Sequence, residues 1–239
     1  MSSRSYRTLM ARAALIPFRV QVQQTDLLIL ATADLTAQAL TLVLEERRRL
    51  EWYIACHPEF ATTLTPWPED PLAPPLVQKM IRAGAVAGVG PMAAVAGAIA
   101  EAVGSQLQLL SREIIVENGG DIYLALQEPA TVALYAGHSP LSLKVGLRLT
   151  PEQTPLGVCT SSGTIGHSLS LGRADAACVL APSAALADAA ATALGNRVRR
   201  PADIQPALEW LATLPEVLGG VVILGDKLGA WGAVELTPL

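Results

Sequence analysis

Apolar and polar positions change in short blocks along this chain, and the period within each block predicts the element that it forms. Val20 and Val22 alternate with polar residues ahead of an apolar run at 27–30. Strands are therefore expected within 19–31 and, over a shorter stretch, at 6–9. The chain is predicted to begin with β-structure.

Helical patterns follow these strands. Asp34 is placed to cap a long helix that continues to about Cys56. Residues 57–75 are rich in proline and predict a loop or a domain edge. Two further helices are expected at 75–86 and 92–109, where small residues suit close packing on a sheet.

The second half of the chain predicts short strands in succession, then helices, then a closing pair of strands. Ser183 is placed as the N-cap of a helix over 184–194, with Gly195 as its C-terminal stop. A further helix is expected near 204–214, and a turn at 225–227 between the closing strands. The expected strands are 114–117, 122–127, 131–135, 143–149, 157–160, 176–180, 221–224 and 230–236.

This order of elements predicts the α+β class, because consecutive short strands favour antiparallel sheets with helices packed in blocks. The chain has 239 residues, of which 51% are hydrophobic and 16% charged, enough for a substantial core. We expect a single domain over 1–239, in which a two-lobed organisation would have its edge near 57–75.

Charge and cysteine content exclude some classes of protein. The net charge is −4 and the longest basic run is 47–49, so nucleic acid is not expected as a partner. Three separated cysteines without CxxC spacing, and an N-terminus without a signal-peptide core, predict a cytoplasmic protein. Residues 83–100 are uncharged but rich in alanine and glycine and are broken by Pro91, so no membrane span is expected.

The segment Asn118-Gly119-Gly120-Asp121 carries the first candidate chemistry. Paired glycines let backbone N–H groups approach a phosphate closely, because no Cβ blocks the way. Asn-Gly between two β runs is also the commonest sequence pattern of a tight hairpin turn. Both interpretations stay open at this point.

The helix after Ser183 carries the second candidate chemistry. Asp188 and Thr192 are four residues apart and lie on one helical face, where they can supply two hard oxygen ligands to Mg²⁺. The alternative is that Asp188 is a solvated helix residue and that Thr192 bonds back to its own helix.

The third candidate chemistry lies in the turn Thr160-Ser161-Ser162-Gly163 and in His167, which follows it. Its hydroxyl and N–H groups suit phosphate oxygens, and His167 can act as a general acid or base or contact a phosphate. The alternative is that His167 fixes the turn through its ring hydrogen bonds. Cys159 is expected to be a buried small residue rather than a nucleophile, because no basic residue adjoins it.

The order of these three motifs resembles the ApbE superfamily of FAD-dependent protein flavinyltransferases, most closely a shorter, uncharacterised branch of it. The resemblance covers about 80–225 and implies that the three motifs bind FAD and Mg²⁺. It also implies that the loop at 88–91 approaches the ligand, against the alternative of a plain helix break. Within the short branch, relatives have been associated with homocysteine formation from sulfide.

The chain departs from the flavinyltransferase pattern at two places. His167 is followed by Ser168-Leu169-Ser170-Leu171-Gly172 instead of a DP-x-TG segment, and the A-K-G-x-x-x-D pattern has alanine at 96 and glutamate at 101. Losing a cation beside a flavin pyrophosphate removes a charge-assisted contact of about 1.5–3 kcal/mol. FAD binding is therefore expected to be weak.

The sequence predicts that this protein binds a small phosphorylated or nucleotide-type ligand, with Mg²⁺ as the cofactor. Asp188 and Thr192 are the expected metal ligands, and His167 and Asp121 the expected catalytic groups. Two alternative functions stay open, which are flavinyl transfer with FAD and the role of a non-catalytic partner subunit. The sequence also leaves open whether the chain associates with copies of itself or with a partner protein. The expected cofactor-binding residues are Asn118, Gly119, Gly120, Thr160, Ser161, Ser162 and Gly163.

Overall fold

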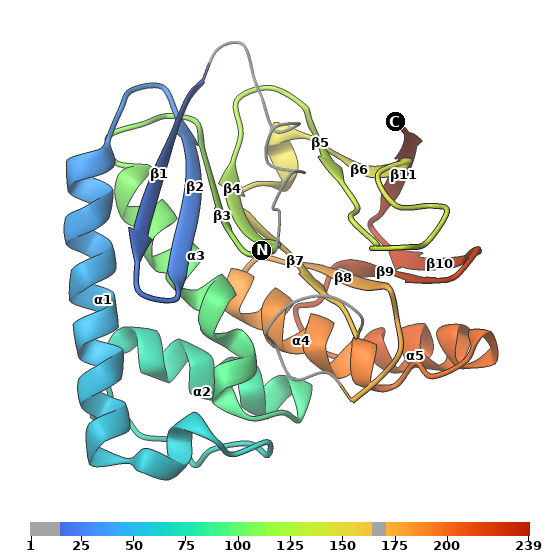
Figure 1. The fold of residues 1–239 in the computed structure, drawn as a ribbon, viewed down its shortest axis with the longest axis horizontal. Coiled ribbons are helices and arrows are strands. Elements are labelled where there is room, and N and C mark those ends of the chain that lie inside the picture. The colour runs from blue at the N-terminus through green and yellow to red at the C-terminus, as the bar shows by residue number, and fades with distance from the viewer. Residues whose placement is uncertain (1–14, 164–170) are drawn as a thin grey trace.

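The computed structural model describes residues 15–163 and 171–239, and its centre is a large antiparallel sheet (Figure 1). Its strands are β1 (Ile16–Val22), β2 (Thr25–Ala31), β3 (Ile114–Asn118), β4 (Asp121–Ala125), β7 (Leu156–Ser161), β8 (Ala176–Ala181), β9 (Gly219–Leu224) and β10 (Lys227–Gly232). They lie in that order, and each neighbouring pair is antiparallel. A small antiparallel sheet has the order β11 (Glu235–Pro238), β6 (Val145–Leu149), β5 (Ala130–Ala133).

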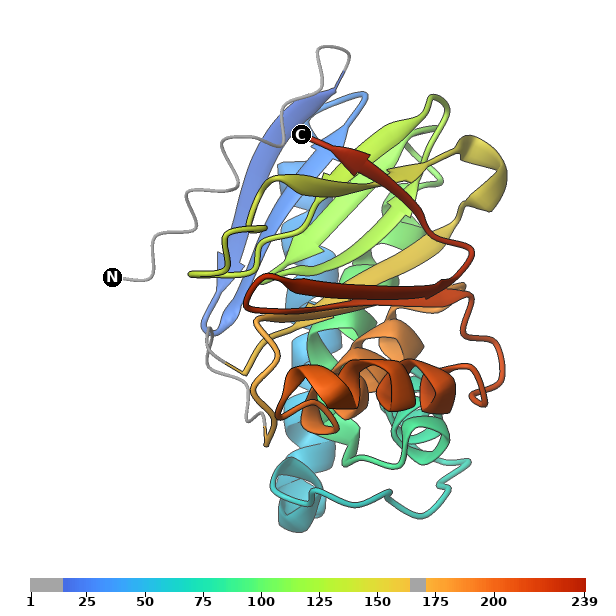
Figure 2. The same cartoon turned by 90° about the vertical axis from the view of Figure 1, so that its right-hand side faces the viewer.

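The helices and the small sheet cover opposite faces of the large sheet (Figures 1 and 2). The α-helices are α1 (Thr36–Cys56), α2 (Pro75–Ala87), α3 (Val95–Leu107), α4 (Ala184–Asn196) and α5 (Ile204–Leu211). The 3-10 helices are η2 (Pro58–Ala61), η3 (Pro91–Ala94), η4 (Pro151–Gln153) and η5 (Pro201–Asp203).

Strand alternation divides the interior into two apolar clusters. In β4, Tyr123 packs into the cluster under the helices, whereas Leu124 packs into the cluster under the small sheet. Because both faces are covered, every residue of β3, β4 and β8 is buried. The apolar, β-branched runs of these strands follow from that burial.

The α+β class and the antiparallel sheets are confirmed, and most elements lie where the sequence predicts them. The expected strand at 6–9 lies outside the described residues. Ser183 is confirmed as the N-cap of α4, because its Oγ accepts a hydrogen bond from the Leu186 N–H at 3.4 Å. Gly195 is wrong as the stop, since α4 continues to Asn196 and Arg197 follows as the C-cap.

Asp34 is also wrong as an N-cap. Leu35 occupies that position, and Asp34 instead accepts hydrogen bonds from the Thr36 N–H and hydroxyl, a local turn just outside the helix. The helix expected at 92–109 begins as η3 and becomes α-helical only at Val95, and it ends at Leu107.

The expected closing strand at 230–236 is two strands in two different sheets. β10 ends at Gly232, whose φ of 83° is in the left-handed region that glycine adopts without strain. The Ala233 N–H then donates to the Leu218 carbonyl, and β11 leaves to pair with β6. The turn at Gly232 thus carries the chain from the large sheet to the small one.

The joint between α2 and η3 bends the chain by 105°. Gly88 ends α2 in the left-handed conformation, and a Cβ on Gly90 would lie 1.9 Å from the Thr63 carbonyl oxygen, so the joint packs against the preceding loop. In the described part of the chain, no single helix is long and apolar enough to cross a membrane. Only when the two parts of this bent pair are counted together do they reach the length and apolar composition of a membrane span.

Candidate functional site

The Gly119-Gly120 segment forms a two-residue hairpin turn between β3 and β4, with φ of 71° and 110°. Positive φ at both positions is the geometry that paired glycines favour, so the hairpin interpretation holds. The Gly120 N–H donates to Glu117 Oε1 at 2.8 Å and therefore already has an acceptor. A Cβ on Gly120 would lie 3.6 Å from the Thr160 carbonyl oxygen. The hairpin therefore lies beside the segment Thr160-Ser161-Ser162-Gly163, called the serine turn below.

Asp121 and Asp188 form a buried carboxyl pair where α4 crosses the large sheet. Asp121 opens β4 on the helix-facing side, the side of Tyr123, and Asp121 and Asp188 are each 8% exposed. Burial, and next the charge of Asp188, raises the pKa of Asp121 well above its ordinary value. Burial raises the pKa of Asp188 to about 7, against hydrogen bonds from the Gly97 and Ala96 backbone. The pair therefore lies in a site that disfavours two negative charges.

One oxygen of this pair has no partner. Asp121 Oδ1 is buried and makes no hydrogen bond within the described residues. Backbone hydrogen bonding at Thr160 and the Cys159 side chain lower the pKa of Asp121, but burial outweighs them. A buried acceptor without a donor costs about 1–3 kcal/mol, which marks this oxygen as a point where something else can bind.

The carboxyl group of Asp188 is tied to the start of α3. Asp188 Oδ2 accepts a hydrogen bond from the Gly97 N–H at 2.9 Å. A Cβ on Gly97 would lie 2.2 Å from the Ala184 carbonyl oxygen, so only glycine lets α3 and α4 approach this closely. The alternative of a solvated Asp188 is therefore wrong.

Glu101 makes the reverse contact, from α3 to the start of α4. Its Oε2 accepts hydrogen bonds from the Ser183 hydroxyl at 2.8 Å and the Ala185 N–H at 3.3 Å, and its Oε1 pairs with Lys79. Each helix thus supplies a carboxylate to the N-terminal N–H groups of the other. Sequence reasoning noted Glu101 only as a departure from the family pattern, because nothing local indicates that it meets Ser183.

Asn118 joins the same site. Its side-chain amide donates to the Ala96 carbonyl at 3.1 Å, which holds the end of β3 against the start of α3. The structure thus brings together Asn118, Asp121 and Asp188 from the predicted set. It adds Glu117, whose charge also raises the pKa of Asp121 and which the sequence analysis did not select.

The serine turn meets this site only in part. Cys159 lies on the helix-facing side of β7 and donates to the Ala184 carbonyl, so by alternation Ser161 shares that side and Thr160 points to the other. On that other side the Thr160 hydroxyl bonds with the Cys178 side chain. Burial raises the pKa of the Cys178 thiol to about 12, and the bond with Thr160 opposes this rise only in part. A Cβ on Gly195 would lie 3.8 Å from Ser161 Oγ, so Ser161 lies toward the C-terminal end of α4.

The remaining predicted residues are placed as follows. The Gly163 N–H donates to the Ala174 carbonyl at 2.9 Å. Thr192 is half-buried, one turn of α4 after Asp188. Ser162 follows β7 and is half-buried. His167 lies outside the described residues, so its role stays a prediction.

Cys159 is fully buried, as expected. Burial, and next the charge of Asp121, raises the pKa of its thiol well above the ordinary value. A thiol that stays protonated is a poor nucleophile, because the thiolate is the reactive form. Its place in the site is structural.

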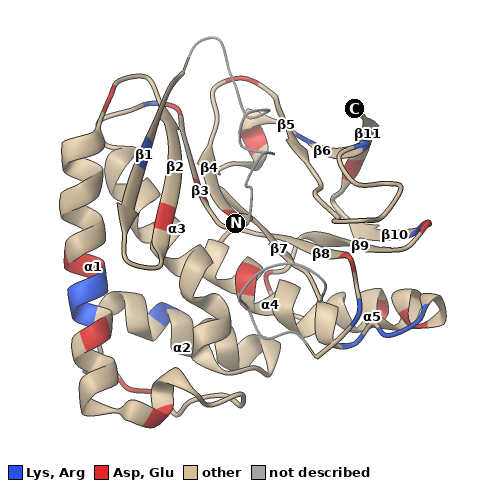
Figure 3. Cartoon of the chain, viewed as in Figure 1, with Lys and Arg blue, Asp and Glu red and all other residues tan. Residues whose placement is uncertain are grey.

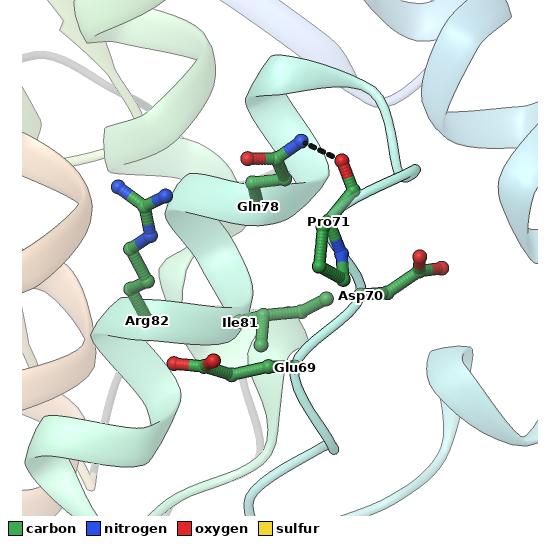
Figure 4. A pocket seen from close by; sticks show the side chains of 6 residues that line it. All are labelled: Glu69, Asp70, Pro71, Gln78, Ile81 and Arg82. Carbon is green, nitrogen blue, oxygen red and sulfur yellow. Dashed lines mark hydrogen bonds between the residues drawn. The ribbon is translucent and has the colours of Figure 1, made fainter.

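A small hollow elsewhere does not belong to this site. It has a volume of about 100 Å³ and lies between the loop before α2 and α2 itself (Figure 4). Its walls include Glu69, Asp70 and Arg82, and the Gln78 side chain donates to the Pro71 carbonyl across it. Neither Asp121 nor Asp188 lines it.

Among the described residues, no group of three or more histidine, cysteine, aspartate or glutamate side chains is arranged to hold a metal. A metal here would rest on the carboxyl pair and on neutral oxygens. Mg²⁺ is compatible with so few protein ligands, because it keeps several waters and takes further oxygens from phosphate.

Three comparisons place this chain among known proteins. A family model described as "AbpE bacteria" matches residues 7–211. A UPF0280 protein of Methanocella arvoryzae is 44% identical over 215 residues, 90% of this chain and 87% of the relative. Another UPF0280 protein, of Methanococcus aeolicus, is 44% identical over 197 residues, 80% of this chain and 79% of the relative.

Solved structures with the same fold are more distant in sequence. The flavin transferase ApbE from Vibrio cholerae has a TM-score of 0.58 at 13% identity, over 91% of this chain and 96% of that one. The ApbE protein from Thermotoga maritima has a TM-score of 0.60 at 11% identity, over 90% of this chain and 96% of that one. At such identity the likeness shows the fold alone.

Proposed function

The chain belongs to the ApbE-like family described as "AbpE bacteria", in a branch with the UPF0280 proteins, and from that premise we propose that it binds a small phosphorylated or nucleotide-type ligand together with Mg²⁺. The proposed site is the carboxyl pair of Asp121 and Asp188 with the adjoining hairpin and serine turn. This proposal goes beyond family membership, because the name UPF0280 assigns no ligand to the relatives.

The observation that carries this proposal is the unpartnered Oδ1 of Asp121 inside a buried carboxyl pair. Two neighbouring carboxylates in a buried site repel each other, and either a proton or a cation relieves the repulsion. The free oxygen gives a cation a place to bind without displacing the hydrogen bond between Asp188 and Gly97.

The residues present fit Mg²⁺ in the type of their donors. Carboxylate oxygens from Asp121 and Asp188, and the Thr192 hydroxyl one helical turn further on, are hard oxygen ligands. Bound Mg²⁺ would supply positive charge next to the ligand's phosphate oxygens. The chain's own contribution is to hold the two carboxyl groups in place from β4 and α4.

The phosphate is proposed to contact the Gly119 N–H and the hydroxyl groups of Ser161 and Ser162. The N–H groups of Gly120 and Gly163 already donate to protein acceptors, so they contribute less than the sequence suggests. Without a metal, burial raises the pKa of Asp121 well above its ordinary value. A carboxylate that binds Mg²⁺ holds no proton, so Asp121 is proposed to act as a metal ligand rather than as a general acid. His167 is the proposed acid or base.

Flavinyl transfer is the second candidate, and the shared fold with the flavin transferase ApbE from Vibrio cholerae favours it. Ala96 in place of the expected lysine, and the missing DP-x-TG segment, argue against it. FAD should bind weakly, and incubation with FAD, Mg²⁺ and a flavinylation target peptide should leave the peptide unmodified. Efficient peptide modification would restore the transferase interpretation.

A non-catalytic partner subunit is the third candidate, and an empty ligand site would favour it. The association of the short branch with sulfide and homocysteine stays an expectation from the resemblance. No residue of the described site selects a sulfur substrate.

Ligand binding can be tested with the purified protein. Small molecules released on denaturation are identified by mass spectrometry, and a panel of nucleotides, flavins and sugar phosphates is screened by thermal shift with and without Mg²⁺. We expect a phosphorylated compound to raise the Tm only when Mg²⁺ is present, because a ligand that binds the native state stabilises it. Asp226→Asn, at an exposed turn, is the matched control for Asp188→Asn. No shift with any compound would overturn the proposal.

A further inference from the structure

The carboxyl pair gathers acidic side chains, whereas a phosphorylated ligand is itself an anion. Glu117 adds a third carboxyl group near Asp121 and Asp188, and Lys79 on α2 is already paired with Glu101. Bound Mg²⁺ would balance two carboxylates, which leaves the charge of about −1.5 to −2 on a phosphate group uncompensated. Such a ligand therefore requires a basic residue from another segment.

Three segments meet at the end of the serine turn, where glycines let their backbones touch. A Cβ on Gly163 would lie 2.6 Å from the Gly172 carbonyl oxygen and 3.2 Å from the Arg173 Cα. A Cβ on Gly172 would in turn lie 1.9 Å from the Gly195 carbonyl oxygen. The Arg173 N–H donates to the Val198 carbonyl at 2.8 Å. The backbone of Arg173 is therefore fixed between the serine turn and the end of α4.

The bond to Val198 also makes Arg173 part of an arginine cluster with Arg197, Arg199 and Arg200, and Figure 3 shows basic residues together beside α5. Arg197 stacks on a tryptophan ring of α5 and donates to a carbonyl in the last turn of α4. Arg200 forms an ion pair with an aspartate three residues later. In the part of the chain that the structure describes, the exposed guanidinium groups of Arg173 and Arg199 have no such partner. Of these two, Arg173 is the one that lies against the serine turn.

One face of α4 leads from the carboxyl pair to this cluster. Asp188, Thr192 and Asn196 follow one another at steps of four residues on that face. The Asn196 side chain accepts a hydrogen bond from the Leu171 N–H at 2.7 Å, so the segment that carries Arg173 lies across the end of the face. At 1.5 Å per residue, α4 spans about 12 Å between Asp188 and Asn196. A metal at one end and a guanidinium at the other would hold two linked groups of one ligand.

We propose that Arg173 binds an anionic group of the ligand at the serine turn, next to the phosphate that Mg²⁺ holds at the carboxyl pair. The inference rests on the proposed function and names its substrate class, a ligand with two linked anionic groups. A guanidinium presents its N–H donors in a planar fork that matches two phosphate or carboxylate oxygens at once. Its positive charge also offsets the repulsion between the acidic site and such a ligand.

Inorganic pyrophosphate is the probe, because it consists of two linked phosphate groups and nothing else. Titration calorimetry of the full chain in Mg²⁺ should show that pyrophosphate binds the wild type. Arg173→Gln should weaken this binding about tenfold or more, through the loss of a charge-assisted contact. Arg173→Lys keeps the charge and should retain part of the affinity. The Tm of both variants should equal that of the wild type, because Arg173 is exposed.

Arg112→Gln is the matched control and should bind pyrophosphate like the wild type. Arg112 is exposed and precedes β3, at the end of that strand opposite to the Gly119-Gly120 hairpin. An equal loss of affinity in Arg112→Gln and Arg173→Gln would reduce the effect to the net charge of the chain and overturn the role of Arg173.

Titration with Mg²⁺ alone separates this inference from the proposed function. The wild type and Arg173→Gln should bind Mg²⁺ equally, whereas Asp188→Asn should not bind it. Pyrophosphate affinity that is equal in the wild type and Arg173→Gln, or absent from both while Mg²⁺ still binds, would overturn the role of Arg173 and leave the metal site standing. A wild type that binds neither Mg²⁺ nor pyrophosphate would overturn the proposed function, and this inference with it.

Discussion

Two carboxylate sites hold α3 and α4 together, and they differ in how completely they are satisfied. Glu101 meets a hydroxyl, a backbone N–H and a lysine. The carboxyl pair of Asp121 and Asp188 is equally buried but leaves Asp121 Oδ1 without a partner. The protein itself satisfies the first site, which is what stability requires. The second has an acceptor that no described residue satisfies, which leaves room for a proton, a water or a ligand, as a binding site requires.

The largest effect should come from removing the satisfied site. Glu101→Ala leaves the Ser183 hydroxyl, the Ala185 N–H and Lys79 without their acceptor, and should lower the free energy of unfolding by about 3 kcal/mol. Glu101→Gln keeps an acceptor for Ser183 and should cost about half as much. Urea unfolding of both variants measures the difference. Equal stability of Glu101→Ala and wild type would show that the Glu101 contacts are not structural.

The pH dependence should be the next largest effect, and it belongs to the unsatisfied site. Burial raises the pKa of Asp188 to about 7, whereas in the unfolded chain a carboxyl group titrates near its ordinary value. Between these values the folded protein keeps a proton that the unfolded chain has released. The free energy of unfolding should therefore fall by about 2 kcal/mol as the pH rises from about 5 to about 7 without Mg²⁺.

Urea unfolding at a series of pH values measures this slope. Asp188→Asn should flatten it, since the variant has no carboxyl group to titrate at this position. Saturating Mg²⁺ should flatten it in the wild type if the metal replaces the proton. A slope that persists unchanged in Asp188→Asn would assign it to groups other than the carboxyl pair.

A smaller gain in stability is expected for Asp188→Asn at neutral pH. Asparagine still accepts the hydrogen bond from Gly97 and removes one of two neighbouring charges, so the free energy of unfolding without Mg²⁺ should rise by about 1 kcal/mol. Metal-dependent ligand binding, measured by titration calorimetry, should be lost. Unchanged metal dependence would remove the central residue of the proposed site.

The smallest effect is expected for Thr192→Val. The change keeps nearly the same volume at a half-buried position and removes one neutral oxygen, so stability should change by no more than about 0.5 kcal/mol. Ligand binding should weaken, but less than in Asp188→Asn. Titration calorimetry of the two variants side by side compares their ligand affinities. A larger loss of affinity in Thr192→Val than in Asp188→Asn would reverse the proposed roles of the two residues.

Much of the local structure could be predicted because its causes are local. Paired glycines adopt the positive φ of a two-residue turn wherever two strands flank them, and Ser183 caps the helix that follows it. Alternation and helical spacing predicted most strands and helices within a few residues. The helix ends were less accurate, as Asp34 at the start of α1 and Gly195 at the end of α4 show, because the first and last turns of a helix depend on what packs against them.

The candidate site could be predicted only in its residue types. The sequence indicated Asp121 and Asp188 as acids in separate motifs, but whether they would be solvated or buried together depended on where α4 crosses β4. The face that Thr160 presents was likewise decided by the register of β7 against β8.

The sequence by itself determined the class of fold and the family, and it indicated the residues that are proposed to hold a metal and a phosphate. Tertiary structure alone decided that Glu101 would meet the start of α4, that β10 and β11 would part at Gly232, and that one buried oxygen of Asp121 would stay unpaired. The reason is physical. Backbone turns and caps depend on neighbours in sequence, whereas burial, the pKa of a buried carboxyl group and the satisfaction of a hydrogen bond depend on segments that are distant in sequence and meet only in the folded chain.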